Sequence, residues 1–228
     1  VLAVVVVALS VALLLWATNN VIVRTTANGV AHIMAQTNAE TAAGRTPPTS
    51  PLRSGSPASL QTWDSLGREG KDVVTDGPNA AMISTVMGKP AKEPIRVYAG
   101  LNAQRDYIAE AHGVLAELIR TGAFHRKVLV IQNGTGSGWV EEWSMSAVEY
   151  LTLGDCATAT MQYSYLGSVG AFLLDRESPK QGARALFTVI HNYWTTLDPQ
   201  TRPKLYTSGV SLGSFGGQAA FASINDMV

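Results

Sequence analysis

Hydrophobic positions follow two different patterns along this chain. Residues 1–23 carry no charged side chain, and the first sixteen are almost entirely valine, leucine and alanine. From residue 93 onward, short apolar runs alternate with longer segments whose apolar residues recur at helical spacing. Residues 24–92 lie between these regions and include a stretch rich in proline, serine, threonine and glycine, which is typical of an extended linker. The pattern therefore predicts three parts: 1–23, 24–92 and 93–228.

The first part has the length and composition of a membrane span. A helix rises about 1.5 Å per residue, so an uncharged apolar run of this length reaches across the hydrocarbon core of a bilayer. Trp16 and Asn19-Asn20 resemble an interfacial end, and Arg24 is the first charged residue. A signal peptide or a buried core helix is the alternative, but no basic residue precedes the run. We therefore expect a transmembrane helix at 1–23 and an integral membrane protein of undetermined orientation.

The third part alternates strands with helices. Apolar, β-prone runs predict strands at 95–98, 127–131, 157–163 and 205–207, and helical spacing predicts amphipathic helices at 102–122, 141–150 and 179–197. This alternation indicates an α/β fold, a parallel sheet with helices on both faces. Ligands of such sheets bind at the carboxyl ends of the strands. Two glycine-rich turns, 134–138 and 209–213, occupy that position.

The second of these turns carries a candidate nucleophile. Residues 209–213 read Gly-Val-Ser-Leu-Gly, a match to G-x-S-x-G, with a strand before it and a helix after it. This is the context of a nucleophile elbow, in which Gly209 and Gly213 let the backbone pass close beside itself. Ser211 is the predicted nucleophile. A Gly/Ser-rich turn without chemistry is the alternative that the short pattern by itself leaves open.

A serine nucleophile also needs N–H donors that stabilise the oxyanion. In this architecture one donor is the amide of the residue after the nucleophile, here Leu212. The second comes from the loop after an earlier strand, and the turn at 134–138 is placed to be that loop. We expect Thr135 or Gly136 to supply this second donor.

The same loop permits a different interpretation. Gly134-x-Gly136-x-Gly138 after a strand is similar to the adenosylmethionine-binding turn of Rossmann-like methyltransferases, although Gln132 stands where an acidic residue is usual. A dinucleotide motif fails because Trp139 replaces the third glycine, and neither turn has the ending of a P-loop. A methyltransferase and a non-catalytic membrane scaffold therefore remain alternative functions.

The charge balance and the cysteine count limit which ligands and partners the protein can bind. Lys+Arg and Asp+Glu number 17 each, so the net charge is zero, which argues against nucleic-acid binding through a basic face. Cys156 is the single cysteine, so there is neither an internal disulfide nor a cysteine-based metal cluster. We expect no metal and no cofactor. The expected partners are the lipid bilayer and a small-molecule or lipid-like acyl substrate.

A family resemblance rests on seven segments, which are 53–56, 63–70, 96–101, 122–124, 136–140, 161–166 and 211–216. Together they resemble the actinobacterial-type family of membrane-anchored α/β-hydrolases. The resemblance implies several N-terminal transmembrane helices, with 1–23 as the last, then an α/β-hydrolase catalytic domain, in a bacterial plasma membrane. It implies a serine hydrolase acting on an ester, thioester or amide. Val210 stands where the family usually has an acidic residue.

The other members of a catalytic triad are not found after the serine. In α/β-hydrolases the order along the chain is Ser, then Asp or Glu, then His. All four histidines precede Ser211, and Asp226 follows too soon after the nucleophile helix to serve as the acid. We therefore expect a fragment whose sheet is truncated after the nucleophile helix, with the histidine and the acid beyond Val228. Such a fragment is predicted to be inactive by itself.

Overall fold

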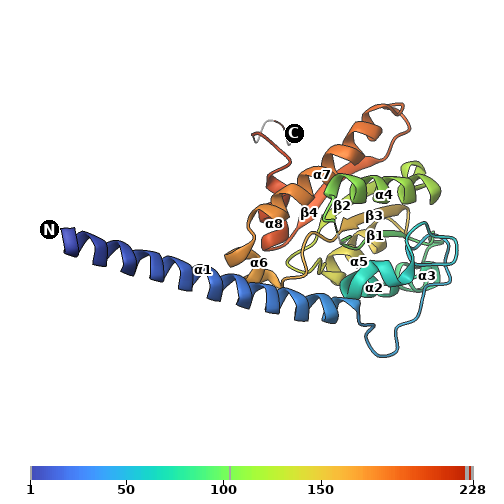
Figure 1. Cartoon of the computed structure of the whole chain (residues 1–228). Helices are drawn as coiled ribbons and strands as arrows, with labels where there is room; N and C mark the ends of the chain where they lie inside the picture. Colours follow the sequence, from blue (N-terminus) through green and yellow to red (C-terminus); the bar gives the residue numbers. More distant parts are fainter. Residues whose placement is uncertain (1, 103, 224–225, 227–228) are drawn as a thin grey trace. The chain divides into compact units, whose positions relative to one another are not determined.

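The computed structural model describes residues 2–102, 104–223 and 226, and the chain divides into two compact units, Val1–Thr37 and Asn38–Val228. The first unit is helical. Its helix is α1 (Leu2–Ala39), drawn in blue in Figure 1.

The predicted transmembrane helix at 1–23 is not supported. A membrane span needs about 20 consecutive, mostly apolar residues. Within the described part of the chain, no helix is both long enough and apolar enough to cross a bilayer. Residue 1 and the side chains of residues 2 and 19–23 lie outside the described residues.

The second unit is built on a parallel sheet of four strands: β1 (Ile95–Ala99), β2 (Val128–Asn133), β3 (Cys156–Met161) and β4 (Lys204–Gly209). Their order is β1-β3-β2-β4 (Figure 1). In this register Ala159 lies opposite both Val97 and Ile131. β1 and β3 are buried throughout, as expected for parallel strands covered on both faces. The predicted α/β class with a parallel sheet is confirmed.

One face of the sheet is covered by α4 (Tyr107–Arg120) and α7 (Glu177–Thr195). α4 begins at a cap, because the Asp106 carboxylate accepts a hydrogen bond from the Ala109 amide at 3.0 Å. Shortly after the end of α4, Gly122 takes a left-handed conformation with φ of 71°. The core of this face joins alternate strand residues to the apolar stripes of both helices: Ile95, Val97, Leu129, Ile131, Ala157, Ala159, Ala111, Val114, Leu118, Leu186 and Ile190.

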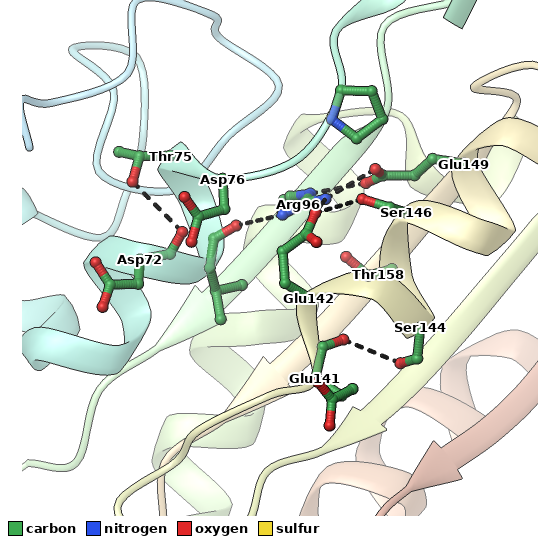
Figure 2. A network of polar contacts seen from close by, with 12 residues as sticks. Asp72, Thr75, Asp76, Arg96, Glu141, Glu142, Ser144, Ser146, Glu149 and Thr158 are labelled. Carbon is green, nitrogen blue, oxygen red and sulfur yellow. Dashed lines mark hydrogen bonds and ion pairs between the residues drawn. The ribbon is translucent and has the colours of Figure 1, made fainter. Parts of the chain in front are cut away.

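The opposite face is covered by α2 (Gly67–Thr75) and α5 (Glu142–Leu151), with α3 (Ala80–Met87) packed beside α5. A smaller core lies here, made of Leu66, Val73, Val74, Tyr98, Val140 and Met145. Arg96 of β1 is fully buried on this face. Its guanidinium forms a bidentate ion pair with Glu149 of α5 at 2.7 and 2.8 Å and donates to the Val73 carbonyl at 2.8 Å (Figure 2).

Part of the region predicted as a linker is folded against the sheet. The Ser54 amide donates to the Arg96 carbonyl at 3.0 Å, and the Tyr98 amide donates to the Ser54 hydroxyl at 3.1 Å. The buried Arg53 guanidinium donates to backbone carbonyls at 74, 76 and 78. Residues 52–78, which include the 3₁₀ turn η1 (Trp63–Leu66), therefore belong to the folded body of the second unit.

Candidate active site

Ser211 lies in the turn between β4 and α8 (Leu212–Gln218), at the carboxyl edge of the sheet. Its backbone angles are φ 50° and ψ −120°. Among the described residues, only two other non-glycine residues, Arg105 and Leu153, have a positive φ. Such a conformation is unfavourable for a residue with a Cβ, and in other proteins it concentrates at functional sites. The side chain is exposed, so the turn presents the hydroxyl to solvent.

The two glycines of the turn are required by close backbone contacts. A Cβ on Gly209 would lie 2.8 Å from the carbonyl carbon of Gly213. A Cβ on Gly213 would overlap the carbonyl oxygen of Asn133, the last residue of β2, and lie 3.0 Å from that of Gly134. The turn therefore packs directly on the end of β2. This contact brings the two glycine-rich turns predicted from the sequence together.

The Leu212 amide has the position expected of an oxyanion donor. Leu212 opens α8, and N–H groups in the first turn of a helix have no acceptor within that helix. The following amides are committed to the turn, since Gly213 donates to the Val210 carbonyl at 2.9 Å and Phe215 to the Ser211 carbonyl at 3.1 Å. The Leu212 side chain is buried, which anchors the start of the helix beside Ser211.

The two amides predicted as the second donor are engaged by the protein itself. The Thr135 amide donates to the Trp139 carbonyl at 2.8 Å, and the Gly136 amide donates to the Tyr163 hydroxyl at 2.7 Å. The loop closes on itself because Gly136 and Gly138 take φ values of 58° and 92°. In this structure neither Thr135 nor Gly136 offers its N–H to a ligand. The sequence predicts no role for Tyr163; its signals are its place at the end of the third predicted strand and within the family-like segment 161–166.

Further contacts hold the loop from several elements. The hydroxyls of Thr135 and Ser168 are 3.0 Å apart. The Ser137 hydroxyl donates to Glu69 at 3.1 Å, and burial is the main cause that raises the pKa of Glu69. The Ser137 carbonyl accepts from Gln162 at 2.7 Å. The loop is thus fixed by residues from the segment after β3, from α2 and from the start of α6 (Ser168–Leu174).

These contacts bear on the methyltransferase alternative. A Cβ on Gly138 would overlap the Tyr98 hydroxyl and lie 3.0 Å from the Gln162 side chain, so protein atoms fill the space beside this glycine. Gln132 is buried and donates to Ser144 at 2.6 Å, on the face of the sheet covered by α5. The geometry gives no support to a cofactor bound against the glycine loop.

Ser211 faces an apolar groove of about 360 Å³. Its wall on one side comes from α6 and on the other from the start of α8. The lining residues are Ser168, Val169, Phe172, Leu173, Ser211, Leu212 and Phe215.

None of the histidines whose side chains the structure describes lines the groove at Ser211. His112 and His125 are exposed, and His191 stacks between Phe187 and Trp194 along α7. The side chain of His32 lies outside the described residues. Within the described residues no histidine lines the groove, and no group of His, Cys, Asp and Glu side chains is arranged to hold a metal ion.

Comparison with known families settles the membership of the chain. A model described as "Alpha/beta-hydrolase family" matches residues 95–228, which is more than half of the chain. The chain belongs to the alpha/beta-hydrolase family. A second model, "Alpha/beta-hydrolase family N-terminus", matches residues 1–78 of the chain. Searches of curated proteins and of solved structures found no significant match.

The membership confirms part of the sequence-based interpretation. The α/β class and the α/β-hydrolase family are confirmed. The serine nucleophile, its oxyanion donors and attachment to a membrane stay predictions. In this α/β-hydrolase the N-terminal family match reaches the residues that pack against β1, so both matched regions contribute to the second unit.

Proposed function

We propose that the protein is a serine hydrolase that cleaves an ester, thioester or amide with Ser211 as its nucleophile. The observation that carries this proposal is the backbone of Ser211, a non-glycine residue at φ 50° with an exposed side chain. A strained turn from strand to helix is the device by which α/β-hydrolases present their nucleophile. The membership of the chain in that family supports the same reading.

The proposed chemistry follows from the groups around the turn. The Ser211 oxygen attacks the carbonyl carbon of the substrate while a base takes the hydroxyl proton, which gives a tetrahedral oxyanion. The Leu212 amide donates to that oxyanion. The leaving group departs with a proton, and water then releases the acyl group from Ser211. Membrane tethering forms no part of this proposal.

The base in this scheme is not among the described residues near Ser211. A serine hydroxyl without a base is a poor nucleophile at neutral pH. We therefore expect the 228-residue chain to show no Ser211-dependent ester hydrolysis. The test of the nucleophile accordingly uses the native protein as its own cells produce it.

A fluorophosphonate probe tests the assignment. We expect the native protein to react covalently with the probe and its Ser211→Ala variant to lose the reaction. Ser214→Ala is the matched control, because Ser214 lies one turn further along α8 and is expected to keep full labelling. Labelling of Ser211→Ala at the wild-type rate, with circular dichroism showing intact folding of both variants, contradicts the proposal.

A further inference from the structure

The short helix α6 exposes apolar side chains on the wall of the groove that faces Ser211. Val169 is 75% exposed, Phe172 45% and Leu173 65%. On the surfaces of soluble proteins, contiguous exposed apolar side chains often mark binding sites. The only polar lining residue of α6 is Ser168, whose hydroxyl is 3.0 Å from that of Thr135 and so belongs to the glycine loop.

The opposite wall is apolar as well. Leu212 and Phe215 of α8 supply it, and Phe215 is 39% exposed. Among the described residues no charged side chain lines the groove, and Ser211 is the only polar lining residue there outside the contact with the loop. A ligand that reaches the Ser211 oxygen along this groove would meet hydrocarbon on both sides. The groove therefore has no means of recognising a charged or strongly polar acyl group.

The size of the groove limits its ligand. Its volume of about 360 Å³ is near the lower end of the roughly 300–1,000 Å³ found for small-molecule sites. α6 has seven residues and so extends for only about 10 Å. A chain of a few carbons leaves such a groove partly empty, and a long lipid chain extends beyond it.

We propose that this groove is the acyl-binding site and that the enzyme prefers medium-chain aliphatic acyl groups. The proposal rests on the proposed function, because it takes Ser211 as the point of attack. Each methylene that enters the groove strengthens binding by roughly threefold to fourfold. Affinity stops rising once the acyl chain extends beyond the end of α6.

The first experiment measures binding without catalysis. The native protein carrying Ser211→Ala is titrated with acetamide, butanamide, octanamide and dodecanamide, and the dissociation constants are measured by calorimetry. We expect affinity to rise by roughly threefold per methylene from butanamide toward octanamide, with little further gain for dodecanamide. Equal affinity across the series overturns the proposal, as does a continued rise to dodecanamide at the same rate.

A matched pair of variants localises the effect. Leu173 lines the groove, whereas its neighbour Leu174 is 57% exposed and is not among the lining residues. We expect Leu173→Gln, in the Ser211→Ala background, to weaken octanamide binding by roughly fivefold to tenfold, and Leu174→Gln to leave it unchanged. Equal effects of the two changes, or none, overturn the assignment, and no effect is the result expected if another protein segment covers the groove.

The two proposals fail in different ways. If Ser211 is not the nucleophile, the fluorophosphonate reaction survives Ser211→Ala while the dependence of binding on chain length persists. If the groove is not the acyl site, the reaction depends on Ser211 but the amide series shows no chain-length optimum. In the active protein, kcat/KM for p-nitrophenyl octanoate is expected to exceed that for both the acetate and the palmitate esters.

Discussion

At the residue scale, the main feature is that Ser211 combines a strained backbone with an exposed side chain. Ser211 is exposed, yet its backbone occupies a region that costs on the order of 1–3 kcal/mol. The packing of Gly213 on Asn133 and the buried Leu212 hold the turn against this cost. Local strain at a solvent-exposed polar residue has no structural benefit of its own, which is why we connect it with chemistry.

Glu110 gives a pH dependence of stability. Its side chain is buried on α4, and burial is the main cause that raises its pKa from 4.5 to about 7, against a hydrogen bond from the Asn102 amide. The folded state therefore binds this proton more tightly than the unfolded chain. The stability associated with protonated Glu110 is fully present below about pH 4.5 and is lost as pH rises toward 7.

We expect Glu110→Gln to remove this dependence. In the wild type, Glu110 contributes a fall in the free energy of unfolding of at most about 1.4 kcal/mol per pH unit between these two pKa values. Urea denaturation at several pH values measures the slope. An unchanged slope in Glu110→Gln would show that another group is responsible.

The buried ion pair in Figure 2 predicts a strongly non-additive result. Glu149→Leu removes the bidentate partner of the buried Arg96 guanidinium and leaves it with the partly exposed Glu142 carboxylate at 3.9 Å, and we expect a loss of about 3–5 kcal/mol in the free energy of unfolding. The double variant Arg96→Met/Glu149→Leu removes both charges and is expected to recover most of that loss. Equal losses in the single and double variants, measured by urea denaturation, count against this account.

At the element scale, the contact between the elbow and β2 is the decisive feature. A Cβ at Gly213 overlaps the Asn133 carbonyl, so we expect Gly213→Ala to cost about 2–3 kcal/mol of stability and to abolish fluorophosphonate labelling. Gly170 of α6 is the matched control, because its Cβ would have no neighbour closer than 3.5 Å. Gly170→Ala should be neutral or stabilise by up to about 1 kcal/mol. Thermal unfolding of both variants makes the comparison.

The elements were largely predictable because their signals are local. Each strand is a short apolar run in the sequence. The turn that carries Ser211 is recognisable from Gly209, Ser211 and Gly213 between a strand and a helix. The state of the glycine loop was not predictable, because its Gly136 amide is paired with Tyr163, 27 residues away. The groove was missed for the same reason, since α6 meets Ser211 only in the folded chain.

At the scale of the whole molecule, the folded body starts earlier than composition suggests. The proline- and serine-rich composition of this region favours a linker. In the structure, Arg53 and Ser54 form hydrogen bonds with backbone groups of other segments, and composition gives no information about such bonds. In the sequence, the charged residue Arg96 within an apolar strand indicates that another segment packs against β1. Such a side chain has to find partners on the covered face of the sheet.

Two truncations test where the folded body begins. A chain starting at Asn38 retains the second unit, and we expect its Tm to lie within about 4 °C of that of residues 1–228. A chain starting at Asn79 lacks the buried Arg53, Leu66 and Val73, and we expect it to lose cooperative unfolding. Differential scanning calorimetry distinguishes these outcomes, and cooperative unfolding of the shorter chain would contradict the inclusion of 52–78 in the core.

The most direct test of the central claim locates the covalent adduct of the fluorophosphonate. The native protein is labelled and digested with trypsin, which cleaves after Lys204 and so leaves Ser208, Ser211, Ser214 and Ser223 on one peptide. Fragmentation in the mass spectrometer then assigns the modified residue. The account predicts a single adduct on Ser211; an adduct on Ser208 or Ser214 instead, or no adduct on this peptide, would contradict it.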